Sequence, residues 1–124
     1  MGKFADVDNF FKNTMKKTAI ALAGVLVASA SFAGNQTGTV QSLTVRDTDG
    51  LVSFTLEGGA RVQPAPCATQ AYWIIRNESS VAGKQLFALL MAAQAAGKTI
   101  VVNGANACTR WGDGEDVRDI SVLH

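Results

Sequence analysis

The chain has 124 residues, 48% of them hydrophobic, and a formal charge of +1. This length accommodates one small domain rather than several. The charges are nearly balanced and form no basic stripe that could neutralise phosphates, which argues against nucleic acid as a partner.

The first feature along the chain is the pattern of a cleavable export signal over residues 15–33. A positive pair, Lys16–Lys17, precedes the apolar stretch Ala19–Ala28, which has ten residues. The small residues Ser31 and Ala33 occupy the minus-three and minus-one positions of a signal-peptidase site. The pattern predicts cleavage after Ala33.

Cleavage there leaves residues 34–124 as a secreted or periplasmic domain. The apolar stretch is shorter than the roughly 20 residues that a membrane-spanning helix needs, so no membrane contact is expected after cleavage. Residues 1–14 contain no motif, and we interpret them as an extension from an upstream start codon. The remaining domain has seven basic and eight acidic residues, a formal charge of −1.

The exported domain begins with a predicted β-hairpin. Residues 38–46 are rich in β-branched side chains, and residues 51–56 alternate apolar and polar side chains, both of which favour strands. The segment Asp47–Gly50 between them has the composition of a turn, with Gly50 able to adopt a positive φ.

A third strand and a helix are predicted next. Residues 71–76 are apolar on both faces, which is typical of a strand covered on both sides. The run 81–96 is rich in Ala and Leu and predicts a helix that Ser79 or Ser80 caps and Gly97 ends. Its broad apolar face is expected in the core, with contact to another copy of the chain, as a homo-oligomer, as the alternative.

Two further strands are predicted at residues 98–102 and 117–123, on either side of a polar, Gly-rich loop at residues 103–116. The order β-β-β-α-β-β is that of a five-stranded Greek-key barrel of the oligonucleotide/oligosaccharide-binding (OB) type. The predicted fold is therefore mainly β with one helix. A small open α+β sheet is the competing architecture.

Both cysteines, Cys67 and Cys108, fall within the exported part and are predicted to form one disulfide. In an oxidising compartment, two cysteines in a small domain most often pair. The bridge would tie the segment before the third strand to the segment after the fourth. A zinc site lacks support, because the only histidine is the terminal His124 and zinc requires four ligands. No metal or cofactor is expected.

Asp113, Glu115 and Asp116 form a dense group of carboxylates in the Gly-rich loop. They could hold Ca²⁺ or act as an acid/base pair. A solvated acidic loop is the favoured interpretation, because a cation site needs more ligands than this stretch offers. His124 is a poor general base at the end of the chain, so the sequence predicts a protein that is not an enzyme.

The residues best suited to ligand binding are amphipathic aromatic side chains and nearby arginines. They are Tyr72, Trp73, Trp111, Arg61, Arg76 and Arg110. An aromatic face beside polar donors suits a sugar ring or a peptide edge. We interpret Trp73 as a core residue in preference to a contact residue, because its neighbours are apolar. Trp111, in the polar loop, is either a lid on the barrel or a contact residue.

Several segments resemble a recurring pattern in small secreted proteins of Gram-negative bacteria. They are Gly83–Lys98, Val102–Gly104, Cys108–Asp113 and Glu115–Val117. More distantly, the pattern is similar to the receptor-binding B subunits of subtilase-type AB5 toxins. That resemblance implies a pentameric barrel that binds glycans, although no glycan-contacting residue of those subunits matches a position here.

The sequence therefore predicts a secreted or periplasmic, non-enzymatic binding domain that recognises a glycan or a protein surface. The alternative hypothesis is a periplasmic structural or stress-related accessory protein without a small-molecule ligand.

Overall fold

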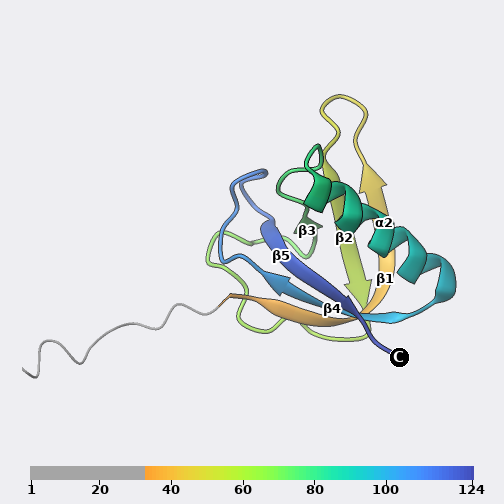
Figure 1. The fold of residues 1–124 in the computed structure, drawn as a ribbon. Helices are drawn as coiled ribbons and strands as arrows, with labels where there is room; N and C mark the ends of the chain where they lie inside the picture. Colours follow the sequence, from red (N-terminus) through yellow and green to blue (C-terminus); the bar gives the residue numbers. More distant parts are fainter. Residues whose placement is uncertain (1–32) are drawn as a thin grey trace, which may run out of the picture. The chain divides into compact units, whose positions relative to one another are not determined.

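The computed structural model describes residues 33–124. The predicted extension at residues 1–14 and the signal peptide, up to residue 32, lie outside the described residues. The elements are β1 (Asn35–Val45), β2 (Val52–Glu57), β3 (Trp73–Ile74), α2 (Val81–Ala96), β4 (Thr99–Gly104) and β5 (Glu115–Val122) (Figure 1). This order confirms the predicted β-β-β-α-β-β sequence. Within residues 33–124, no helix is long and apolar enough to cross a membrane.

The five strands close into a barrel in the order β1-β2-β3-β5-β4, and β4 pairs with β1. Every pair is antiparallel except β3 and β5, which are parallel. This is a Greek-key barrel of the OB type, so the open α+β sheet is excluded. A register shift between Val40 and Ser42 lies in β1, whose first part pairs with β4 and whose second part pairs with β2. Such an irregularity bends a strand, as closure of a barrel requires.

The core fills the inside of this barrel. On β2, Val52, Phe54 and Leu56 are buried, as the alternation of that segment predicts. Other members of the core cluster come from β1, β3, α2, β4 and β5. They include Val40, Trp73, Leu90, Ala93, Ile100, Val102, Val117 and Ile120.

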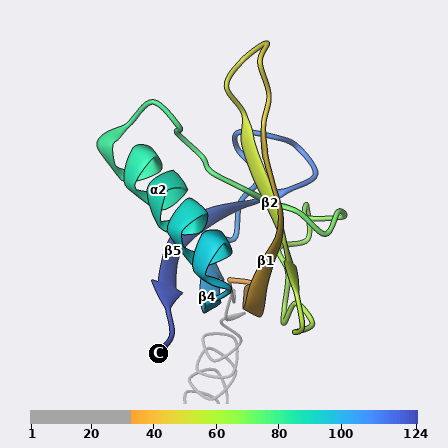
Figure 2. The same cartoon turned by 90° about the vertical axis from the view of Figure 1, so that its right-hand side faces the viewer.

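The helix α2 lies against β1 and β5 and buries Leu90 and Ala93 (Figure 2). Its ends form as the sequence predicts. The Ser80 hydroxyl accepts a hydrogen bond from the Gly83 N–H at 3.0 Å, and Gly97 ends the helix with a φ of 63°. Met91 belongs to the broad apolar face of the helix that is expected in the core, but it is 46% exposed. Contact of this face with another copy of the chain stays a prediction.

The third strand is much shorter than predicted. Only two residues of the expected segment 71–76 pair as β3. In place of a neighbouring strand, the Arg61 guanidinium donates hydrogen bonds to the carbonyl oxygens of Gln70, Ala71 and Tyr72 at 3.1–3.2 Å. Because an arginine from the preceding segment takes up these carbonyls, the chain joins the ladder only at Trp73.

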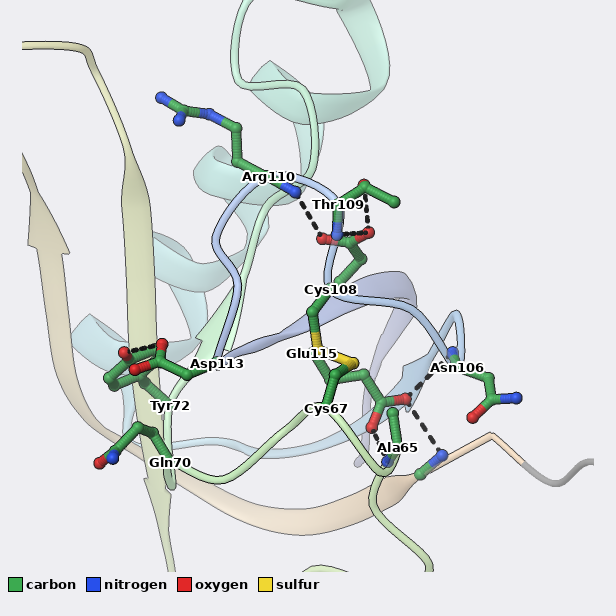
Figure 3. Close-up of a disulfide and its surroundings, with 12 residues drawn as sticks. Ala65, Cys67, Gln70, Tyr72, Asn106, Cys108, Thr109, Arg110, Asp113 and Glu115 are labelled. Atoms are coloured by element: carbon green, nitrogen blue, oxygen red, sulfur yellow. Dashed lines mark hydrogen bonds between the residues drawn. A yellow bond between two sulfur atoms is a disulfide. The ribbon is translucent and has the colours of Figure 1, made fainter.

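The disulfide between Cys67 and Cys108 is present, with Cα atoms 6.1 Å apart. Cys67 lies in the segment between β2 and β3, and Cys108 lies in the loop between β4 and β5. The bridge therefore joins the two segments that the sequence analysis predicts it to join (Figure 3).

The interpretation of the carboxylate group as a solvated loop is wrong for two of its three members. Glu115 and Asp116 are fully buried at the start of β5, which begins two residues earlier than predicted. Glu115 accepts hydrogen bonds from the backbone N–H groups of Gly34, Ala65 and Asn106 at 3.1, 2.8 and 3.2 Å. A carboxylate that accepts several N–H bonds can replace the water it loses on burial.

Asp116 plays the same part for the loop between β4 and β5. Its carboxylate accepts hydrogen bonds from the backbone N–H and hydroxyl of Thr109 and from the backbone N–H of Arg110 (Figure 3). Asp113, the third member of the group, is half-buried. The close fit around Glu115 extends to Gly104, where a Cβ atom would lie 1.7 Å from Oε2 of Glu115.

We expect removal of the disulfide to destabilise the folded domain of residues 34–124 strongly. The double variant Cys67→Ser, Cys108→Ser should lose about 4 kcal/mol of unfolding free energy, because the bridge closes a long loop in the unfolded chain. Urea unfolding followed by tryptophan fluorescence measures this loss. An unchanged unfolding midpoint would show that the buried carboxylates hold these segments without the bridge.

Candidate functional site

A pocket of about 280 Å³ opens on the side of the barrel where β1, β2 and β3 meet the loop between β4 and β5. Its lining consists of two aromatic side chains, two hydroxyl side chains, two aliphatic side chains and one arginine. These residues are Tyr72, Trp111, Thr44, Ser53, Leu51, Ile74 and Arg46. OB-type barrels bind ligands on this part of the surface, between the β1–β2 and β4–β5 loops.

Trp111 forms one wall of the pocket and is 38% exposed. The Arg46 guanidinium carbon lies 4.4 Å from the centroid of the indole ring. At the ring edge, Nε1 of Trp111 donates a hydrogen bond to the Tyr72 hydroxyl at 3.1 Å. A cation over the ring and a hydrogen bond at its edge therefore fix its orientation. Both roles predicted for Trp111, contact residue and lid on the barrel, stay predictions.

Tyr72 connects Trp111 to Asp113. Its hydroxyl accepts from the Trp111 indole and donates to the Asp113 carboxylate, which it faces in Figure 3. Desolvation and the hydrogen bond to Asp113 raise the pKa of Tyr72 above its ordinary value. The phenol therefore stays protonated and keeps this chain of hydrogen bonds intact at neutral pH.

Charged side chains join the loops around the pocket. Arg110 donates to both carboxylate oxygens of Glu78, at 2.9 and 3.2 Å, and to the backbone carbonyl of Asp49 at 3.1 Å. Arg46 pairs with the Asp49 carboxylate. The hydrogen bonds from Arg46 hold the pKa of Asp49 well below its usual range, and those from Arg110 lower the pKa of Glu78. These partners stay charged together and link the β1–β2, β3–α2 and β4–β5 loops.

Two residues of the predicted binding set have structural roles instead. Trp73 is completely buried, and its Nε1 donates to Oε1 of Gln36 at 2.8 Å. The Arg61 guanidinium carbon lies 4.0 Å from the centroid of the Trp73 ring, which accords with the interpretation of Trp73 as a core residue. Neither residue lines the pocket.

The remaining members of the predicted set differ in their relation to the pocket. Tyr72 and Trp111 line it, and Arg110 supports the neighbouring loops. Arg76 is exposed on the segment between β3 and α2. The sequence does not single out Arg46 as a pocket residue. Its place beside the β1–β2 turn is a signal that could have identified it, because this turn and the Trp111 loop flank one face of an OB-type barrel.

Within residues 33–124, no group of three or more His, Cys, Asp or Glu side chains is arranged to hold a metal ion. Comparison of the chain with protein-family models, with curated proteins and with solved structures finds no match. The resemblance to small secreted bacterial proteins and toxin B subunits stays a prediction.

We expect the variant Asp113→Asn to lower the pKa of Tyr72, because the loss of the carboxylate charge removes a group that favours the protonated phenol. Tyr72 is the only tyrosine, so the ultraviolet absorbance of its phenolate reports this pKa alone. Asp47→Asn is a matched control on the exposed β1–β2 turn. Equal titration curves for Asp113→Asn and the wild type would contradict the hydrogen-bond chain.

The raised pKa of Tyr72 also determines how the contribution of this side chain to stability changes with pH. The folded-state pKa of Tyr72 lies above the unfolded value of about 10. The contribution to stability is therefore complete below that unfolded value and is lost as the pH rises through the folded-state pKa.

Proposed function

We propose that this chain is a secreted or periplasmic, non-enzymatic binding domain and that the pocket beside Trp111 recognises a glycan. The observation that carries the proposal is a partly exposed indole, held in place by Arg46 and Tyr72, in a pocket that also presents two hydroxyl groups. Binding sites combine apolar and aromatic walls with a few polar groups that fix the orientation of the ligand.

The chemistry of the lining suits a sugar ring. The exposed part of the Trp111 ring offers an apolar, electron-rich surface to the C–H groups of a sugar. Thr44 and Ser53 place hydroxyl groups on the adjoining strands β1 and β2, and a hydroxyl both donates and accepts hydrogen bonds. With about 280 Å³, the pocket suits a short saccharide end rather than a large ligand.

The pocket is held in its shape by the protein itself. The indole N–H of Trp111 is already bonded to Tyr72, and the Arg46 guanidinium is already paired with Asp49. A ligand that stacks on Trp111 therefore has little side-chain motion to suppress, and a smaller ordering cost leaves more of the interaction as affinity.

The disulfide supports the proposed location. A bridge between Cys67 and Cys108 persists in oxidising compartments such as the periplasm and the extracellular space. The export pattern at residues 15–33 points to the same route.

We expect the exported wild-type protein to bind a defined subset of glycans on an array, and Trp111→Ala to weaken that binding by about tenfold or more, the loss typical of an aromatic anchor. Titration calorimetry with the strongest glycan measures the ratio. Leu123→Ala is the matched control, because Leu123 is similarly exposed, at 42%, and lies outside the pocket.

The control variant should bind as the wild type does, and thermal unfolding should show that all three proteins are folded. Binding to no glycan, or equal affinities for Trp111→Ala and the wild type, would overturn the assignment of this pocket. In that case a protein surface or an accessory role without a small ligand would account for the domain better.

A further inference from the structure

Gly34, the residue after the predicted cleavage position, makes a backbone hydrogen bond to a buried carboxylate. The backbone nitrogen of Gly34 donates to Oε2 of Glu115 at 3.1 Å, and both residues are buried. The carbonyl oxygen of Gly34 accepts from the Gly104 N–H at 2.7 Å. The first residue of the exported domain is therefore held through both of its backbone polar groups, whereas chain termini are usually loose.

Glu115 has no cationic partner in the part of the chain that the structure describes. All three of its hydrogen-bond donors are backbone N–H groups, and none of the ion pairs among residues 33–124 includes it. Arg61 is coupled to it only through space, outside ion-pair distance. A counter-ion at hydrogen-bond distance attracts a buried carboxylate more strongly than it would in water, because the dielectric of the interior is low.

We propose that signal-peptide removal supplies this counter-ion, so that the α-ammonium group of Gly34 forms a buried ion pair with Glu115 in the processed protein. A signal peptidase hydrolyses the Ala33–Gly34 amide bond, with one water consumed. The carbon–nitrogen bond breaks, Ala33 leaves as a carboxylate, and Gly34 keeps the nitrogen as an ammonium group. The inference rests on the export proposed above and does not require that the pocket binds a glycan.

Glycine is the residue that this arrangement requires at position 34. A Cβ atom there would lie 2.6 Å from Oε1 of Glu115 and 3.0 Å from the Cα atom of Pro64. A larger first residue would push the amine away from the carboxylate. Gly34 is thus both an acceptable residue after the peptidase site and the residue that lets the new terminus reach Glu115.

The ion pair would act on the loops that the disulfide joins. Glu115 also binds the backbone of Ala65 and Asn106, each of which lies two residues before a bridged cysteine (Figure 3). The loop that contains Asn106 continues to Trp111. Processing of the chain therefore strengthens the same attachment that positions one wall of the pocket.

The test uses the full chain exported by a Gram-negative host, beside the unprocessed full chain refolded with its disulfide. N-terminal sequencing should find Gly34 first in the exported protein. The pH dependence of its α-amine labelling, followed by peptide mass spectrometry, should give a pKa at least one unit above the ordinary value of about 7.7–8.0. An unprocessed amide at Gly34 has no such titration.

Thermal unfolding provides the second measurement. A raised α-amine pKa stabilises the processed protein fully below the unfolded-state pKa, and this stabilisation is lost as the pH rises through the folded-state pKa. The melting temperature of the processed form should fall over that interval relative to the unprocessed form. Arg61 interacts with Glu115 through space. The other buried carboxylate beside the pair, Asp116, accepts from Thr109 and from the backbone N–H of Arg110.

The variant Glu115→Gln should return the α-amine pKa to its ordinary value and remove the pH-dependent difference. Asp116→Asn is the matched control: it replaces the neighbouring buried carboxylate and should leave the α-amine pKa raised. If Glu115→Gln does not fold, the α-amine pKa and the pH dependence of the melting temperature in processed and unprocessed wild-type protein test the ion pair.

An ordinary α-amine pKa in the processed wild type would overturn the ion pair while leaving export intact. A first residue other than Gly34 would overturn it as well. If the processed wild type has a raised α-amine pKa but binds no glycan, only the proposed pocket is overturned.

Discussion

The buried carboxylates at the start of β5 are the constraint on which the rest of this domain depends. Neighbouring residues of a strand point to opposite sides, so Glu115 and Asp116 serve different segments. Glu115 binds the backbone directly before β1, in the segment between β2 and β3, and after β4. Asp116 binds the next turn of the β4–β5 loop. Irregular segments need acceptors for their buried N–H groups, and here two side chains provide them.

The β4–β5 loop is consequently fixed on its inner side and free to interact on its outer side. Thr109 and the backbone N–H of Arg110 bond to Asp116, whereas the side chains of Arg110 and Trp111 reach Glu78 and Tyr72. A loop anchored in this way presents an aromatic ring in one orientation. The barrel thus provides a rigid support, and the exposed loop provides the surface on which the proposed recognition depends.

Local signals in the sequence predicted the local structure well. The helix with its Ser80 and Gly97 ends, the first hairpin and the disulfide all depend on residues that are close in sequence or on composition. The length of β3 could not be predicted, because it depends on where the Arg61 side chain lies. The burial of Glu115 and Asp116 could not be predicted either, because it depends on contacts between distant parts of the chain. One donor to Glu115 is 81 residues away in the sequence. Composition alone makes such a group of carboxylates look like a solvated loop.

The close approach around Glu115 also constrains how this sequence can change in evolution. A Cβ atom at Gly34 or at Gly104 would lie 2.6 or 1.7 Å from the Glu115 carboxylate, so a substitution of either glycine requires the buried carboxylate to move. Loss of the glutamate alone would leave a void and three backbone donors without an acceptor. Substitutions at the three positions are therefore coupled. Distant relatives should either keep all three residues or show coordinated substitutions at all three.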